Sequence, residues 1–121
     1  MSYIDGFLLA VPSDKRDAYR DLSEKAWPLF EEWGATRQVE CWSDDVPRGE
    51  TTDFFRAVKA GPNESVVFSW IEYPSKVVRD AAQVRMREDP RMKEWGEEMN
   101  FVDGKRMVFG GFIPLMDKSN P

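Results

Sequence analysis

Two segments of this chain are apolar on both sides of an extended strand, and this pattern restricts the folds that it can adopt. Tyr3 to Val11 is almost entirely apolar on both alternations, and Val66 to Tyr73 repeats the pattern with Ser69 and Glu72 as polar members. Strands of this kind are covered on both faces. The sheet that contains them therefore needs helices on one face and a second layer on the other.

The predicted strands and helices follow one another in a recognisable order. Strands are expected at residues 3–11, 36–43, 66–73 and 105–115, and helices at 13–33 and 75–88, with a further helical turn or two at 91–99. The order strand, helix, strand, strand, helix, strand is typical of the ferredoxin-like βαββαβ arrangement. We therefore predict an α+β fold in one domain, residues 1–121, with an antiparallel sheet and two helices on one of its faces.

Local signals set the expected ends of these elements. Ser13 and Ser75 each follow a proline and are the expected helix N-caps, and Gly34 is placed as a C-cap. Pro28 is expected to kink or restart the first helix. Residues 54–60 are ambiguous, and Gly61-Pro62-Asn63 after them suggests a hairpin into the third strand.

The uncovered face of the sheet predicts a partner. Two helices can cover only one face, so a second copy packed sheet against sheet would bury the other. Such a homodimer would bury roughly 1,600 Å² or more.

Composition excludes several classes of site. The chain has 121 residues, no histidine and one cysteine, which removes His-dependent nucleophile pairs, an internal disulfide and all-cysteine metal sites. We expect no metal and no cofactor. The net charge of −5 and the absence of a basic cluster do not favour nucleic acid as a partner. With no basic leader and no long apolar run, the sequence predicts a cytoplasmic protein without a membrane span.

The candidate site is the stretch from Arg37 to Pro47. On the strand within it, Gln38, Glu40 and Trp42 share one face, which is neither ordinary core nor ordinary surface and predicts a polar cavity. Glu40 is the candidate catalytic base, if desolvation in a cavity raises its pKa. The alternative is a glutamate that faces water or pairs with Arg56 or Arg106.

A wider set of side chains is expected to contact a substrate. Its members are polar or aromatic residues of the predicted sheet and its ends: Trp42, Trp70, Glu72, Asp5 and Arg106. Of these, Glu72 and Asp5 are the predicted carboxylate companions of Glu40 across the sheet.

Two other features have ordinary structural interpretations. Cys41 is expected to be a small buried apolar group, with a thiolate activated by Arg37 as the alternative. Asp44-Asp45 is expected to end the strand as a loop cap rather than to hold a metal ion.

Three motifs resemble one small bacterial family. They are Glu40-Cys41-Trp42-Ser43-Asp44-Asp45-Val46-Pro47, Phe68-Ser69-Trp70-Ile71-Glu72-Tyr73-Pro74, and Asp103-Gly104-Lys105-Arg106-Met107 followed by Gly110-Gly111-Phe112. The family is the domain of unknown function 1428, whose members often carry a label that refers to a signal-recognition-particle RNA. The resemblance covers essentially the whole chain and implies the dimeric α+β barrel superfamily, which includes cofactor-free monooxygenases and lactone isomerases.

Three hypotheses about function follow. The first is a homodimer that binds a small, partly apolar molecule in the barrel, with a cofactor-independent oxygenase or isomerase as its enzymatic form. The second is a non-catalytic binding or structural dimer whose barrel is filled by its own side chains. The third, RNA binding, follows from the family label alone and is not supported by an acidic chain.

Overall fold

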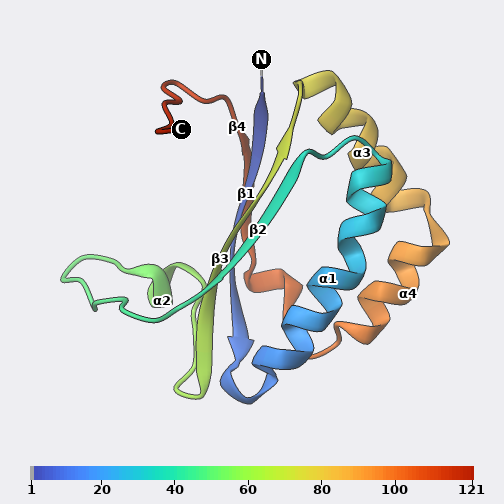
Figure 1. Ribbon diagram of the computed structural model, residues 1–121. Helices are drawn as coiled ribbons and strands as arrows, with labels where there is room; N and C mark the ends of the chain where they lie inside the picture. The colour runs from blue at the N-terminus through green and yellow to red at the C-terminus, as the bar shows by residue number, and fades with distance from the viewer. Residues whose placement is uncertain (1) are drawn as a thin grey trace.

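The computed structural model describes residues 2–121 and shows an antiparallel sheet with helices packed on one face (Figure 1). The strands are β1 (Tyr3–Pro12), β2 (Arg37–Trp42), β3 (Glu64–Tyr73) and β4 (Val108–Phe112). The helices are α1 (Arg16–Glu32), α2 (Phe54–Ala57), α3 (Lys76–Glu88) and α4 (Pro90–Glu98), with 3-10 turns at Ser13–Lys15 and Gly104–Arg106. The strand order β2-β3-β1-β4 confirms the predicted ferredoxin-like α+β fold.

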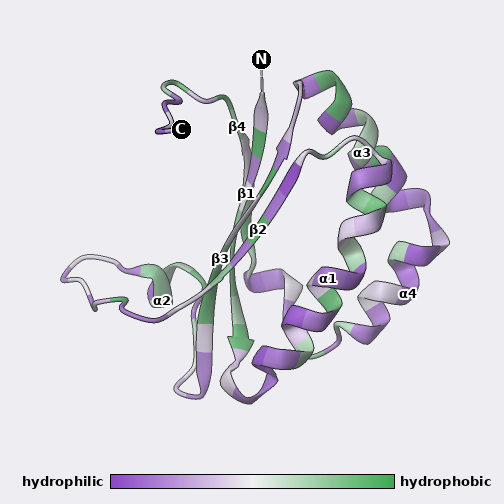
Figure 2. Ribbon diagram, viewed as in Figure 1, coloured by the Kyte–Doolittle hydropathy of each residue, from purple (hydrophilic) through white to green (hydrophobic). Residues whose placement is uncertain are grey.

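The two faces of the sheet differ in what covers them. Helices α1, α3 and α4 lie on one side, here called the helix face, while α2 lies on the other side, the open face (Figure 1). Apolar colour runs along β1 and β3, while polar bands mark the helices (Figure 2). None of the helices in residues 2–121 combines the length and apolarity needed to cross a bilayer.

The core lies mainly between the sheet and the helices. It is built from two clusters of buried side chains that join strand and helix residues: Ala26, Phe30, Trp33, Ala35, Ile71, Tyr73 and Ala82, and Leu9, Val11, Tyr19, Val67 and Met99. A smaller cluster of Ala10, Val58 and Val66 covers part of the open face. The segment after α2 thus supplies a partial lid for a sheet face that would otherwise be bare.

Helix ends follow the predicted capping at some sites only. Gly34 has a φ of 106°, and the Ala35 amide donates to the Phe30 carbonyl across 2.9 Å, which closes α1 as a Schellman motif. Ser75 Oγ accepts from the Val78 amide across 3.2 Å, as predicted for an N-cap. Pro28 lies inside α1, which continues without a restart to Glu32.

Two local predictions were wrong. Ser13 does not cap α1, because its hydroxyl instead shares a 2.9 Å hydrogen bond with the Ser65 hydroxyl, and α1 begins at Arg16. Residues 54–60 do not form a hairpin with β3. They begin with the short helix α2, whose N-cap Asp53 accepts from the Arg56 amide across 2.7 Å, and the partners of β3 are β1 and β2.

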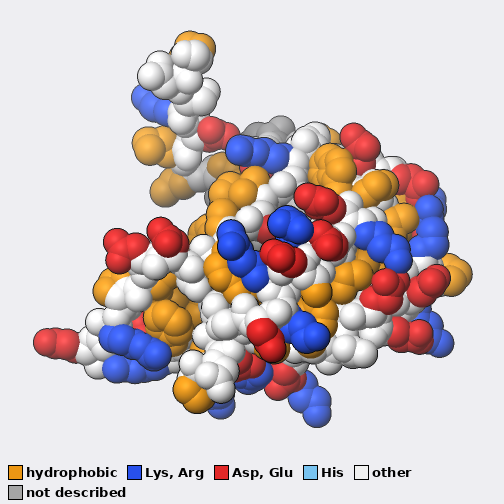
Figure 3. All heavy atoms as spheres, turned by 60° about the horizontal axis from the view of Figure 1, so that its bottom comes forward, with side chains coloured by type: hydrophobic (Ala, Val, Ile, Leu, Met, Phe, Trp, Pro, Cys, Tyr) orange, Lys and Arg blue, Asp and Glu red, His pale blue; other side chains and the backbone are white. Residues whose placement is uncertain are grey.

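Charged side chains are mixed on the surface shown in Figure 3. Lys and Arg side chains lie among Asp and Glu side chains over that face, with no broad area of one sign. The C-terminal segment after β4 projects from the body in the same view.

Candidate functional site

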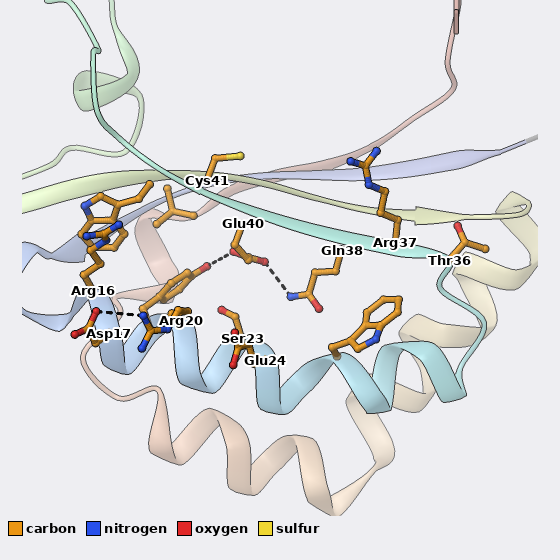
Figure 4. Close-up of a pocket in the computed structure, with 14 residues that line it drawn as sticks. Arg16, Asp17, Arg20, Ser23, Glu24, Thr36, Arg37, Gln38, Glu40 and Cys41 are labelled. Carbon is orange, nitrogen blue, oxygen red and sulfur yellow. Dashed lines mark hydrogen bonds and ion pairs between the residues drawn. The ribbon is translucent and has the colours of Figure 1, made fainter. Parts of the chain in front are cut away.

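A cavity of about 790 Å³ lies between the edge strand β2 and helix α1 (Figure 4). This volume falls within the range of small-molecule sites. The lining comes from α1, from β2 and the residue before it, and from one residue of β3: Arg16, Asp17, Tyr19, Arg20, Ser23, Glu24, Trp27, Thr36, Arg37, Gln38, Glu40, Cys41, Trp42 and Val67. We call it the α1/β2 cleft.

Local periodicity explains why these side chains meet. Alternate residues of β2 face the same side, so Gln38, Glu40 and Trp42 all reach the cleft from the helix face. Residues four apart on a helix also share a face, which places Tyr19 and Ser23 opposite them. Figure 4 shows Gln38 and Glu40 directed toward α1.

Glu40 is held by two neutral hydrogen-bond donors. Tyr19 Oη donates to Oε1 across 2.6 Å, and Gln38 Nε2 donates to Oε2 across 3.0 Å. Burial, reinforced by the Glu40 carboxylate, raises the pKa of the Tyr19 phenol far above its ordinary value. Tyr19 therefore stays protonated and serves as a fixed donor rather than as a base.

Gln38 leaves one acceptor unused. Its Nε2 must face the Glu40 carboxylate, because the reversed amide would place two acceptor oxygens together. Its Oε1 is consequently turned elsewhere, and it is buried without a hydrogen-bond partner among residues 2–121. An unsatisfied buried acceptor is costly, so a donor that reaches this oxygen after a small rotation of the Gln38 side chain would offset that cost.

Aromatic side chains supply the apolar part of the cleft. The rings of Tyr19 and Trp42 have centroids 6.5 Å apart with planes inclined at 50°, and Trp27 and Val67 add further apolar surface. The cleft therefore combines a polar centre with walls suited to a partly apolar molecule.

The predicted companions of Glu40 do not join it. Trp70 and Glu72 belong to the open face, where Trp70 Nε1 donates to Glu72 Oε2 across 2.8 Å. The register sets Glu72 opposite Arg37, and directly opposed residues share a face. Arg37 and Glu40 are three residues apart on β2 and therefore face opposite sides of the sheet. Glu72, which shares a face with Arg37, thus lies on the opposite side from Glu40.

Asp5 and Arg106 are also engaged elsewhere. Asp5 is on the helix face but two strands away from Glu40, and it accepts from Arg79 Nε across 2.9 Å. Arg106 pairs with Glu64 through two hydrogen bonds of 2.7 and 2.8 Å. The alternative ion pairs of Glu40 were also wrong, because both arginines have other partners. Arg106 pairs with Glu64, and Arg56 lies 3.6 Å from Asp53.

The remaining sequence candidates lie on the surface. Cys41 is exposed, not buried as predicted, because β2 is an edge strand and turns this side chain to the open face. Asp44 and Asp45 are exposed in the loop after β2. No group of three or more Cys, Asp or Glu side chains within residues 2–121 is arranged to hold a metal ion.

Sequence reasoning missed the helix side of the cleft. Neither Tyr19 nor Ser23 was among the predicted site residues, yet both are buried and line the cleft. The available signal was a serine on the apolar side of that helix, four residues after a tyrosine.

A second hollow lies on the open face. Its volume is about 610 Å³, and its lining is almost entirely apolar, including Leu8, Phe68, Trp70, Val108 and Phe112. We call it the open-face groove. It offers few polar groups with which to orient a ligand, in contrast to the α1/β2 cleft.

Comparisons with known proteins show the relatives of this chain. The family model described as a protein of unknown function, DUF1428, matches residues 2–103. The uncharacterised protein YbaA of Escherichia coli (strain K12) is 64% identical over 118 residues, covering 98% of this chain and 100% of YbaA.

Solved structures add a likeness of fold. A dimeric ferredoxin-like protein from an uncultured marine organism aligns with a TM-score of 0.66 at 10% identity, covering 99% of this chain and 100% of that chain. An uncharacterised NIPSNAP domain protein from Burkholderia xenovorans aligns with a TM-score of 0.63 at 13% identity, covering 98% and 99%. Fold is all that these two likenesses show, whereas the family model and YbaA agree over most of the sequence. The chain therefore belongs to the DUF1428 family.

Proposed function

We propose that this protein is a homodimer that binds a small, partly apolar molecule in the α1/β2 cleft. The observation that carries the proposal is that a fixed carboxylate, Glu40, lies beside the Oε1 of Gln38, which has no hydrogen-bond partner among residues 2–121, at a cavity of about 790 Å³. Polar groups that fix the orientation of a ligand, beside aromatic side chains that pack on its apolar part, are usual features of such sites. The single exposed thiol, Cys41, suits a reducing cytoplasm.

The open face supports the homodimer. Phe54, Phe68, Val108 and Phe112 are large apolar side chains there, with exposed fractions of 41%, 47%, 45% and 61%. A contiguous apolar surface of this kind favours burial against a partner. A dimeric ferredoxin-like protein shares the fold, which adds support for the same mode of pairing.

The proposed ligand position differs from the barrel position expected from the sequence. The side chains of Phe54, Phe68 and Trp70 pack edge to face with ring centroids 6.1 and 5.7 Å apart, and they occupy part of the open face. A barrel filled by such aromatic side chains is the alternative, non-catalytic reading of the dimer. It leaves the α1/β2 cleft untouched, because that cleft lies on the other side of β2.

The dimer can be tested by introducing a glutamate on the open face and, as a control, a glutamate on the exposed surface of a helix. Phe68→Glu is expected to give a folded monomer, because a carboxylate would be buried between the sheets. Val77→Glu is the matched control, since Val77 is 79% exposed on α3. Sedimentation velocity over a range of concentrations measures the result. A wild-type monomer, or a Phe68→Glu dimer as tight as the control, contradicts the proposal.

The ligand can be sought directly by native mass spectrometry of freshly desalted protein. The wild type is expected to carry a small non-covalent adduct, and Glu40→Gln to lose most of it. Glu88→Gln is the control, because Glu88 is exposed on α3 away from the cleft. Equal retention in both variants would place the molecule elsewhere, and adduct-free wild-type protein contradicts binding.

Turnover is a second candidate, favoured by the position of Glu40 in the middle of the cleft (Figure 4). Glu40 would remove a proton from a carbon acid, which is the first step expected of a cofactor-independent isomerase or oxygenase. Wild-type protein incubated with its retained molecule in D₂O is then expected to introduce deuterium at carbon, and Glu40→Gln is not. Equal exchange in the two proteins removes Glu40 from any such reaction.

A further inference from the structure

Glu40 is a partly buried carboxylate without a positively charged partner among residues 2–121. Its two hydrogen-bond donors, the Tyr19 phenol and the Gln38 amide, are both neutral. The ion pairs of the described chain involve other carboxylates, namely those of Asp5, Asp17, Asp21, Glu32, Asp53, Glu64, Glu72, Asp80, Asp89, Glu98 and Asp103. Removing a carboxylate from water without a counter-charge is costly, and a cationic ligand would offset that cost.

The second group that could receive a ligand donor, once the Gln38 side chain turns toward the cleft, is also an acceptor. Gln38 Oε1 has no partner in the described chain, and a carboxylate can accept more hydrogen bonds than the two that Glu40 receives. The centre of the cleft therefore has acceptors to spare. A ligand that satisfies it must bring N–H or O–H donors.

The arginines that line the cleft do not supply this charge. Arg20 lies 3.2 Å from Asp21 and 3.7 Å from Asp17, and Arg37 lies 3.6 Å from Glu72 on the open face. Arg16 is exposed at the start of α1, at one end of the cleft in Figure 4, whereas Glu40 is near its middle.

Aromatic walls complete the argument. Trp42, Tyr19 and Trp27 line the same cavity as Glu40. Aromatic faces attract cations, and Trp does so most strongly. A cleft with a carboxylate, a spare amide oxygen and aromatic walls thus favours a cation over a neutral or anionic group.

We propose that the molecule held in the α1/β2 cleft carries a protonated amine or amidine on an apolar body. The cationic N–H group pairs with Glu40 and donates to Gln38 Oε1, and the apolar body packs on the aromatic walls. This inference rests on the proposed function, and it makes Glu40 a binding group rather than a base.

Three probes with the same aromatic body test the charge requirement. They are 4-methylbenzylamine, 4-methylbenzyl alcohol and 4-methylbenzoate, which share a 4-methylphenyl body and carry a cationic, a neutral and an anionic substituent on it. Titrations at pH 7, followed by the indole and side-chain amide NMR signals of the protein, give the three affinities. The amine is expected to bind at least tenfold more tightly than the alcohol, with the benzoate weakest. Its advantage is expected to weaken as salt is added.

Variants separate the two contacts. Glu40→Gln is expected to abolish the tenfold advantage of the amine, and Gln38→Met to reduce it, while Glu88→Gln leaves it unchanged. Circular dichroism confirms that each variant is folded.

The outcomes distinguish this inference from the proposed function. An alcohol or benzoate that binds as tightly as the amine overturns the cationic class while leaving the cleft as a binding site. If no probe shifts signals from the cleft, the inference is also overturned. The native mass spectra of wild type and Glu40→Gln then decide separately whether a different molecule binds there.

Discussion

Arg79 on α3 donates from Nε to Oδ1 of Asp5 on β1 across 2.9 Å, and Asp5 is only 4% exposed. Burial raises the pKa of the Asp5 carboxyl above its ordinary value, although Arg79 opposes that shift. Replacing Arg79 with Met leaves a buried carboxylate without its counter-charge. We expect Arg79→Met to lower the free energy of unfolding at pH 7 by about 3–5 kcal/mol, measured by urea titration.

The sign of the pH effect provides the control. Because folding raises the pKa of the Asp5 carboxyl, this group favours the folded state most at pH values below 3.8, the pKa that it has in the unfolded chain. That stabilisation is lost as the pH rises. The penalty of Arg79→Met is therefore expected to be smaller near pH 3.5 than at pH 7. A double variant that also carries Asp5→Asn should lack this pH dependence, and a penalty independent of pH would contradict the assignment.

Two tyrosines provide a matched pair of hydroxyl deletions. Tyr19 Oη donates to Glu40, whereas Tyr73 Oη is buried without a hydrogen-bond partner among residues 2–121. Tyr19→Phe is expected to cost about 1–3 kcal/mol of unfolding free energy, because a hydrogen bond to a charged group is lost. Tyr73→Phe is expected to be neutral or to stabilise by up to about 1 kcal/mol. Equal costs in urea titrations would show that the two hydroxyls are in similar environments.

The Glu64–Arg106 pair predicts a loss of stability in acid. Hydrogen bonds from Arg106, and one from the Gly61 amide, lower the pKa of Glu64 from 4.5 to about 2. A lowered carboxyl pKa stabilises the fold above the unfolded value, and that contribution is lost as pH falls from about 4.5 to about 2. Glu64→Gln should be less stable than wild type by roughly 1–2 kcal/mol at pH 7, and most of that difference should be lost by about pH 2.5. A difference that does not change with pH between these points contradicts the assignment.

Adjacent glycines in β4 are expected to respond differently to the same change. A Cβ at Gly111 would overlap Tyr3 Oη and the Arg79 guanidinium, whereas a Cβ at Gly110 would sit 3.5 Å from the Phe112 ring. Gly111→Ala is therefore expected to lower the thermal midpoint by several degrees, and Gly110→Ala to leave it nearly unchanged. Similar midpoints for the two variants would show that Gly111 is not needed for the close approach of Tyr3 and Arg79.

The fold was predictable because its signals are local. Apolar residues on both alternations of β1 and β3 indicated a covered sheet, and Gly34 and Ser75 marked helix ends correctly. Ser13 failed as a cap because its hydroxyl bonds to Ser65, which is 52 residues away. The sequence around Ser13 could not indicate that its hydroxyl would bond to a distant serine instead of capping the helix.

The candidate site was predictable on one side only. Alternation along β2 grouped Glu40 with Gln38 and Trp42, and all three line one cleft. The relation of β2 to β3 depends on register, which a sequence does not fix by itself, so Glu72 was placed with Glu40 although it lies on the opposite face. The contact between Tyr19 and Glu40 depends on how α1 packs against the sheet, which is a tertiary property.

Strand order has a consequence for how the chain folds. The central strands β1 and β3 pair along ten residues, from Tyr3 with Tyr73 to Pro12 with Glu64, while β2 pairs with β3 alone and β4 with β1 alone. Neither half of the chain can thus assemble a sheet without the other. During synthesis, β1 can pair with β3 only after more than half of the polypeptide has been made. Pairings between segments that are distant in sequence make folding slow.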